Sequence, residues 1–261
     1  MIETQQTRAA ARPAALITGG AVRLGRAIAL ALAGAGYDIA LHYGRSAEAA
    51  ETTANEVRAL GVACHSFSAD LADAAALPEL VAQAQAALPK LSVLVNSASA
   101  YTQASIAATT AEIFDQQLAV NLRAPFFLTQ AFARTVERGH VINIIDNKIA
   151  FNQFEYAAYL LAKKALAEFT RMAALEFAPR LAVNGVAPGV VLPATTRSDE
   201  YVAWRVSGIP LRRQGTTDDI TGAILYLLGS AFVTGQILLV DGGEALTNVG
   251  QHAAQFDPKK V

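Results

Sequence analysis

The chain has 261 residues, and its 21 Lys and Arg residues nearly balance 22 Asp and Glu residues, which gives a formal net charge of −1. Because proteins that bind nucleic acid through its phosphates carry a basic excess, this balance argues against a nucleic-acid partner. The only cysteine, Cys64, excludes an internal disulfide and fits a reducing compartment. The four histidines lie too far apart in the sequence for a metal site, so we expect no metal.

The hydropathy pattern argues against a membrane protein. The longest apolar run lies between Arg26 and Asp38 and has eleven residues, well short of the ~20 that span a bilayer. Residues 1–13 are polar and lack the apolar core of a signal peptide, so they are expected to form a short flexible arm. These features predict a cytoplasmic protein without membrane contact.

Short β-branched runs alternate along the chain with segments rich in alanine and leucine that have helical periodicity. Strands are expected at 14–18, 39–43, 62–66, 91–96, 140–145, 181–186 and 236–240. Helices are expected at 24–35, 47–60, 74–88, 157–177 and 218–229, with a long helical region at 110–137 that Pro125 kinks or divides. This order predicts an α/β fold, a Rossmann-type doubly wound parallel sheet of about seven strands with helices on both faces.

No linker or repeat divides the segment 14–243, so it is expected to be a single domain. Periodicity fails in the loop 188–210, which contains Trp204 and which we expect to close over a substrate. The tail 244–261 is polar and is expected either to be disordered or to dock on a neighbouring subunit.

A glycine-rich turn joins the first strand to the first helix. It reads Thr18-Gly19-Gly20-Ala21-Val22-Arg23-Leu24-Gly25. Glycine suits this position because the backbone can approach a pyrophosphate closely, with the N–H groups of the helix aimed at it. A plain turn is the alternative, but the position between a first strand and an alanine-rich helix favours a dinucleotide site.

The end of the second strand indicates which nicotinamide cofactor binds. NAD-specific proteins place an acidic residue there to accept a hydrogen bond from the ribose, whereas this chain reads His42-Tyr43-Gly44-Arg45-Ser46. Arg45 and Ser46 suit a 2′-phosphate, and Arg23 would add a second cation. The alternative is that Arg45 is only a solvated loop residue. We predict NADPH.

Tyr159 and Lys163 lie four residues apart on a predicted helix and therefore share one face, whereas Lys164 is rotated away. An ammonium beside a phenol lowers the pKa of the phenol, which would make Tyr159 a useful general acid. This spacing is common by chance, and its place directly after the fifth strand gives it weight.

Taken together, these motifs resemble the short-chain dehydrogenase/reductase family over about residues 14–243. The matching set is Thr18-Gly19 with Gly25, Asn96-Ser97-Ala98, Asn121, Tyr159-x-x-x-Lys163 and Pro188-Gly189. The resemblance implies an NAD(P)(H)-dependent oxidoreductase, commonly a homotetramer, whose cofactor contacts these segments.

The resemblance also implies individual roles. Tyr159 would transfer the proton, and Lys163 would hold the nicotinamide ribose and lower the pKa of the tyrosine. Asn121 would support a water-linked proton path. Asp70, followed by Leu71, would meet the adenine.

Three departures from the family pattern narrow the resemblance. Arg23 replaces the middle glycine of the turn, Asp146 replaces the serine thirteen residues before the tyrosine, and Ser97 and Ser99 stand in the fourth-strand motif. The first two resemble the pteridine reductase branch, as do Leu41–Ser46 and Ala173–Pro179. In that branch an aromatic residue at the position of Tyr101 stacks on the pterin.

An aspartate suits a pterin better than a ketone. A ring nitrogen of a reduced pterin needs a proton as hydride arrives, and a carboxyl group beside a tyrosine can hold or pass it. A carboxylate would instead repel the alkoxide that develops from a ketone. The alternative is that Asp146 is a structural cap and Tyr101 a core or rim aromatic.

The sequence therefore predicts an NADPH-dependent reductase of a dihydropterin or a dihydrofolate-like substrate, which would be contacted by Ser99, Tyr101, Asp146 and Tyr159. One rival is a carbonyl reductase that acts on a 3-oxoacyl thioester or a sugar ketone. Another alternative is a nucleotide-sensing binding protein that has lost catalysis. The presence of both Tyr159 and Lys163 argues against this alternative.

Overall fold

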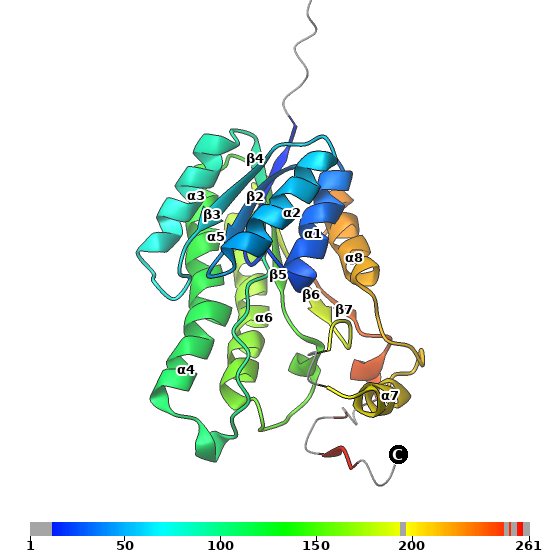
Figure 1. Ribbon diagram of the computed structural model, residues 1–261. Helices are drawn as coiled ribbons and strands as arrows, with labels where there is room; N and C mark the ends of the chain where they lie inside the picture. The colour runs from blue at the N-terminus through cyan, green and yellow to red at the C-terminus, as the bar shows by residue number, and fades with distance from the viewer. Residues whose placement is uncertain (1–11, 194–196, 248–250, 252–254, 258–261) are drawn as a thin grey trace, which may run out of the picture.

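The computed structural model describes residues 12–193, 197–247, 251 and 255–257. Within these ranges one sheet has seven strands, all parallel, in the order β3-β2-β1-β4-β5-β6-β7 (Figure 1). The strands are β1 (Ala14–Ile17), β2 (Asp38–Tyr43), β3 (Cys64–Ser68), β4 (Leu91–Asn96), β5 (Gly139–Ile144), β6 (Leu181–Pro188) and β7 (Ile237–Val240). This sheet confirms the predicted fold class.

Helices cover both faces of the sheet. One face packs against α1 (Arg23–Gly34), α2 (Ala47–Ala59) and α8 (Thr217–Gly229). The other packs against α3 (Ala76–Ala87), α5 (Ala124–Thr135) and α6 (Ala157–Phe177). Because both faces are covered, β1 is buried at every residue and carries no charge. None of the helices in the described ranges is long and apolar enough to cross a membrane.

The core forms because each helix turns an apolar stripe toward the sheet. In α1 that stripe is Ile28, Ala29 and Leu32, all essentially inaccessible to solvent. Full burial of one Ile or Leu side chain contributes about 1.5–3 kcal/mol, whereas alanine contributes less and lets the backbones approach. The alanine-rich helices thus hold the strand ends in fixed positions, and these ends carry the site described below.

The long helical region is divided as expected from Pro125, but less simply. It consists of α4 (Ala111–Leu118), a π-helical segment η2 (Ala119–Arg123) and α5, in whose first turn Pro125 lies. The chain is already helical before α5, since Arg123 has helical backbone angles and the N–H of Ala124 donates to the carbonyl oxygen of Ala119, so Pro125 directly follows the π-helical segment and does not begin a new helix.

The interpretation of 188–210 as a loop without secondary structure is wrong, because it contains the helix α7 (Asp199–Ser207). Ser198 begins this helix by accepting a hydrogen bond from the backbone N–H of Tyr201, and two acidic residues occupy its first turn. Tyr201 is its buried residue, so the helix has no apolar stripe that periodicity would reveal. Residues 194–196 of the predicted loop lie outside the described residues.

The described part of the C-terminal tail packs against its own chain, and docking on a neighbouring subunit stays a prediction. A short 3₁₀ turn, η4 (Glu244–Leu246), follows β7, and the Glu244 side chain is buried. The predicted N-terminal arm falls mostly outside the described residues, although Pro13 already accepts a hydrogen bond from the N–H of Asp38 at 2.9 Å.

Candidate active site

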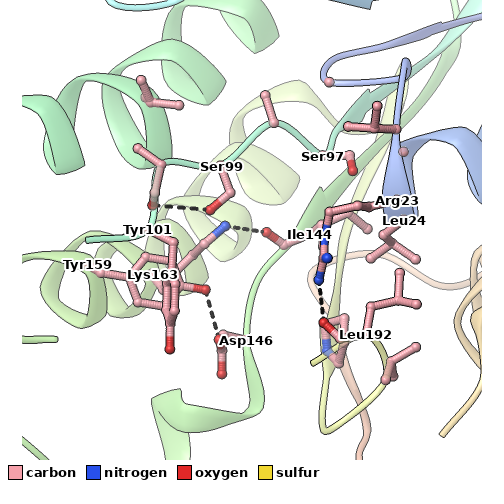
Figure 2. Close-up of a pocket in the computed structure, with 18 of the residues that line it drawn as sticks. Arg23, Leu24, Ser97, Ser99, Tyr101, Ile144, Asp146, Tyr159, Lys163 and Leu192 are labelled. Carbon is pink, nitrogen blue, oxygen red and sulfur yellow. Dashed lines mark hydrogen bonds between the residues drawn. The ribbon is translucent and has the colours of Figure 1, made fainter. Parts of the chain in front are cut away.

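A cleft of about 850 Å³ lies at the carboxyl ends of the central strands, where open α/β sheets bind ligands. It runs from the β1–α1 turn to α7, and Figure 2 shows its central part. The predicted residues that line it are Gly19, Arg23, Leu24, Gly25, His42, Tyr43, Arg45, Ser46, Asp70, Leu71, Ser97, Ala98, Ser99, Tyr101, Asp146, Tyr159, Lys163, Pro188 and Gly189. The fold thus brings most of the predicted site residues together.

The β1–α1 turn is built so tightly that glycine is required. A Cβ on Gly25 would lie 2.0 Å from the carbonyl oxygen of Gly19. Gly19 itself has φ +65°, and a Cβ there would lie 2.9 Å from the Cα of Ala98. The packing of the turn itself therefore requires these glycines, and a pyrophosphate at the first N–H groups of α1 stays a prediction.

Arg23 adopts a backbone conformation that L-residues rarely take, with φ 52°. Its exposed side chain crosses the cleft and donates a hydrogen bond to the carbonyl oxygen of Leu192 in the segment after β6 (Figure 2). Such strain persists at functional sites when the surroundings fix it. Arg23 thus ties the glycine-rich turn to the predicted substrate loop.

Thr18 and Asn96 do not line the cleft but hold its wall. The Thr18 hydroxyl accepts hydrogen bonds from the N–H groups of Ser97 (3.0 Å) and Ala98 (3.1 Å). The Asn96 amide donates to the side chain of Asn143 on β5 at 2.8 Å. Both residues position the segment after β4, and neither is placed to touch a ligand.

Asn121, in the π-helical segment, does not line the cleft but holds the loop that does. Its side-chain oxygen accepts a hydrogen bond from the Ser99 hydroxyl at 2.8 Å, and its amide donates to the carbonyl oxygens of Ala100 (2.8 Å) and Gln117 (3.0 Å). π-Helical turns often occur at functional sites because they widen the helix. Here the turn directs Asn121 to the loop that carries Ser99, and the water-linked proton path stays a prediction.

The other end of the cleft carries the residues predicted for the adenosine part of the cofactor. His42 is buried, accepts a hydrogen bond from the N–H of Gly19 at Nδ1 (3.1 Å) and meets the carbonyl oxygen of Ala69 at Nε2 (3.1 Å). Burial lowers the pKa of His42, so the ring is neutral and one nitrogen can accept while the other donates. His42 therefore fixes the two loops between which the cleft opens.

Arg45 and Ser46 lie directly before α2 and are exposed. Within the described residues Arg45 has no hydrogen bond or ion pair, and the Ser46 hydroxyl makes no capping bond to the helix. A free guanidinium and a free hydroxyl at a helix N-terminus suit a phosphate. Nearby, the Asp70 carboxylate accepts from the N–H of Ala72 at 2.9 Å.

The proton-transfer pair lies between the end of β5 and α6. The Tyr159 hydroxyl donates a hydrogen bond to Oδ2 of Asp146 at 2.8 Å (Figure 2). Oδ1 of Asp146 accepts from the N–H of Lys148 at 2.8 Å. Burial raises the pKa of Asp146, although both hydrogen bonds oppose that shift. Burial and the Asp146 carboxylate together raise the pKa of Tyr159 well above its usual value.

The expected lowering of the Tyr159 pKa by Lys163 is therefore not found. Lys163 donates to the carbonyl oxygen of Ile144 at 2.8 Å, and its ammonium lies over the Tyr159 ring, 5.7 Å from the centroid, while the phenol oxygen faces Asp146. Burial lowers the pKa of Lys163 to about 8 against the opposing effect of Asp146. The raised pKa keeps Tyr159 protonated but makes its phenol a weaker acid than a tyrosine whose pKa is lowered toward neutrality.

Tyr101 forms part of a row of three tyrosines. Its ring stacks on that of Tyr156, with centroids 4.5 Å apart, and meets the edge of Tyr159 at 4.7 Å. Tyr101 is 60% exposed, so much of its ring faces open space and can contact a planar ligand.

The cleft also contains several residues that the sequence pattern did not predict, most of them on or near α7. They are Lys148, Tyr156, Arg197, Tyr201 and Arg205. The signal for α7 was the capping residue Ser198 followed by two acids, which commonly begins a helix. Trp204, expected in a lid, does not line the cleft and instead contacts the rings of Tyr201 and Phe256.

A buried ion cluster joins α7, the turn after Asp146 and the C-terminal tail. The Glu244 carboxylate accepts from Asn147 Nδ2 (2.8 Å), Arg205 (3.0 Å) and Lys148 Nζ (3.1 Å). Its side chain is 2% exposed. Because Lys148 also donates its N–H to Asp146, this cluster supports the proton-transfer pair from behind.

Comparison with known proteins places the chain in a family. Residues 20–244 match the family model described as enoyl-(acyl carrier protein) reductase. An uncharacterized oxidoreductase of Mycobacterium tuberculosis is 37% identical over 245 residues, which cover 90% of this chain and 93% of that protein. The chain belongs to the short-chain dehydrogenase/reductase family. The resemblance inferred from the motifs is thereby confirmed at the level of the family.

Other members of the short-chain dehydrogenase/reductase family differ in activity. The 3-oxoacyl-[acyl-carrier-protein] reductase FabG of Staphylococcus aureus is 32% identical over 237 residues, covering 88% of this chain and 96% of that protein. The crystal structure of FolM alternative dihydrofolate reductase 1 of Brucella suis, in complex with NADP, has a TM-score of 0.86 at 32% identity and covers 95% of this chain and 98% of that one. Membership of the family therefore establishes the fold of a reductase. It does not determine the substrate, which depends on the side chains of the cleft.

Proposed function

We propose that the protein is an NADPH-dependent reductase of a reduced pterin or dihydrofolate-like substrate. The observation that carries this proposal is the hydrogen bond of 2.8 Å between the Tyr159 hydroxyl and Asp146, whose pKa is raised. Arg23 in the turn and Tyr101 beside the pair support it, as does the similarity to the FolM structure of Brucella suis.

The chemistry favours a carbon–nitrogen double bond over a ketone. As hydride adds to the carbon, the electron pair of the double bond moves to the nitrogen, which takes the proton of Tyr159. When Asp146 is protonated, the hydrogen bond across the same 2.8 Å runs from its carboxyl group to the phenol oxygen. Asp146 then returns a proton to Tyr159 as the phenol gives its own to the nitrogen, and the raised pKa of Asp146 favours that protonated form. An ionised Asp146 would oppose the negative charge that develops on a ketone oxygen.

NADPH would supply the hydride when bound. The glycine turn would take its pyrophosphate, Arg45 and Ser46 would hold the 2′-phosphate, and Lys163 would hold the ribose next to the nicotinamide. The solved FolM structures of Brucella suis and Brucella canis contain NADP, which supports this choice. The homotetramer implied by the family resemblance stays a prediction.

The proposal is tested by following NADPH oxidation with dihydrofolate, dihydrobiopterin and an acetoacetyl thioester. We expect the pterins to give the higher kcat/KM, and Asp146→Ala to lower kcat on them by about 100-fold or more, the usual contribution of a general acid. Asp115→Ala, which removes an exposed carboxylate on α4, is the matched control. Pterin turnover no higher than that of Asp146→Ala would refute the proposal.

A second candidate is a 3-oxoacyl thioester reductase, which the similarity to FabG of Staphylococcus aureus favours. A kcat/KM on the acetoacetyl thioester above that on both pterins would select it. Tight NADPH binding without turnover of either substrate class would select a binding protein instead.

A further inference from the structure

The end of the cleft beyond Tyr101 and Tyr156 carries an arginine, Arg197, that has no acidic partner among the described residues. Arg197 donates a hydrogen bond to the Tyr156 hydroxyl at 3.2 Å, and its guanidinium lies over the Tyr201 ring, 4.7 Å from the centroid. In the part of the chain that the structure describes, no carboxylate pairs with Arg197, which is partly exposed and lines the cleft. Tyr156 and Tyr201 thus position the Arg197 guanidinium, which can bind an anion in the cleft.

Arg205, four residues after Tyr201 on α7, also lines the cleft. Its side chain is only 12% exposed, and its Nε is buried without a hydrogen-bond partner among the described residues. The Glu244 carboxylate that it contacts is shared with Lys148, so one carboxylate serves two cations. Because this Nε is inaccessible to solvent, Arg205 acts on a ligand in the cleft through its positive charge and not through that donor.

The tyrosine row leads from the proton donor to this cationic end. Tyr159 meets Tyr101 edge to face, Tyr101 stacks on Tyr156, and Tyr156 accepts the hydrogen bond of Arg197. A ligand that reaches from Tyr159 to Arg197 passes the exposed ring of Tyr101, since Tyr156 is buried against that ring, and ends at a guanidinium. The chemistry that matches is a ring to be reduced, a planar aromatic spacer and a terminal carboxylate.

We propose that Arg197, with Arg205 behind it, forms a carboxylate subsite that selects folate-class substrates, which are reduced pterins with a p-aminobenzoylglutamate tail. A guanidinium can bind a carboxylate through two parallel hydrogen bonds, which gives geometric selectivity as well as affinity. This inference rests on the proposed reductase function. Arg197 is a specificity-determining residue and takes no part in the proton transfer, since Tyr101 and Tyr156 separate it from Tyr159.

The first test is the ratio of kcat/KM for dihydrofolate to kcat/KM for dihydrobiopterin, whose short side chain has no carboxylate. Arg197→Gln is expected to lower this ratio about tenfold, through a higher KM for dihydrofolate, because one partly exposed charged hydrogen-bond pair is lost. Arg197→Lys restores part of it through its charge. Arg138→Gln removes an exposed arginine at the amino-terminal edge of the sheet and should keep the ratio. An unchanged ratio in Arg197→Gln overturns the subsite.

The second test reads the subsite without the reaction. p-Aminobenzoylglutamate is titrated by calorimetry into the full chain loaded with NADP⁺, and p-aminobenzamide, which lacks the carboxylates, serves as the control ligand. We expect the glutamate compound to bind about tenfold more weakly to Arg197→Gln with an unchanged melting midpoint. If the protein reduces no pterin, the proposed function fails. Weaker binding of p-aminobenzoylglutamate to Arg197→Gln would still support the subsite. If p-aminobenzoylglutamate binds equally well to the wild type and to Arg197→Gln, the proposed subsite is overturned, even if the protein reduces dihydrofolate.

Discussion

The buried Glu244 makes a sharp prediction about stability. Its carboxylate accepts hydrogen bonds from Asn147 Nδ2, Arg205 and Lys148 Nζ at 2.8, 3.0 and 3.1 Å, with 2% of the side chain exposed. Glu244→Gln keeps the shape and one acceptor oxygen but removes the charge. Two cations then remain in a site with little access to water.

The expected cost follows from this burial. Removing one partner of a buried ion pair destabilises a protein by about 3–5 kcal/mol, and we expect about 3 kcal/mol because glutamine still accepts one hydrogen bond. At about 2–4 °C per kcal/mol for a chain of this size, the melting midpoint falls by about 6–12 °C. Burial raises the pKa of Glu244, but Arg205 and Lys148 lower it further, so the net shift is downward. The charge therefore stabilises the fold above the unfolded pKa, and this contribution is lost as pH falls through the folded pKa.

The assay is thermal unfolding of the wild type and the variant at neutral pH and at decreasing pH. The matched control is Glu56→Gln, which removes the carboxylate of the exposed Arg26 pair, whose distances of 2.8 Å are as short as those of the buried cluster. We expect the control to barely move the midpoint because water screens exposed pairs. The difference in melting midpoint between Glu244→Gln and the wild type should become smaller as the pH is lowered. Equal shifts in both variants would refute the reasoning from burial.

Two further predictions concern the cofactor. Because the pKa of Lys163 is lowered to about 8, raising the pH through 8 removes its positive charge, and the KM for NADPH should rise there. Lys163→Met should abolish this inflection, whereas Lys164→Met, which removes a lysine bonded to Asn152, should keep it. Arg45→Ala should lower the preference for NADPH over NADH by about tenfold or more, measured as the ratio of kcat/KM values. A wild type that uses NADH equally well would contradict the assignment of Arg45.

The fold was predictable because its determinants are local and periodic. The range 91–96 predicted for β4 and the range 157–177 predicted for α6 match the structure at both ends. Uncharged strands covered on both faces and helices with apolar stripes leave few alternatives to a parallel sheet. The pairing of Asp146 with Tyr159 was also accessible, since the end of one strand and the start of the next helix must meet at the carboxyl edge of the sheet.

The cationic end of the cleft was not predictable, because its determinants are distant in the sequence and have no period. Glu244 is 96 residues from Lys148 and 39 from Arg205 along the chain, and no local pattern indicates that a polar tail residue becomes buried. The helix α7 has a single buried residue, Tyr201, so its periodicity is weak. Long-range partners decide burial in both cases, and only the folded chain shows them.

The position of Lys163 shows what helical spacing can and cannot decide. Four residues of separation place Lys163 on the face of Tyr159, as expected, but the ammonium is drawn to the carbonyl oxygen of Ile144 while the phenol turns to Asp146. A serine in place of Asp146 would not hold the phenol oxygen by a charged hydrogen bond, nor raise the pKa of Tyr159 by its charge. The replacement of one residue in the family pattern therefore changes the acid itself. In the proposed function, Asp146 acts on the proton donor, and the arginines in the cleft near α7 act on the choice of substrate.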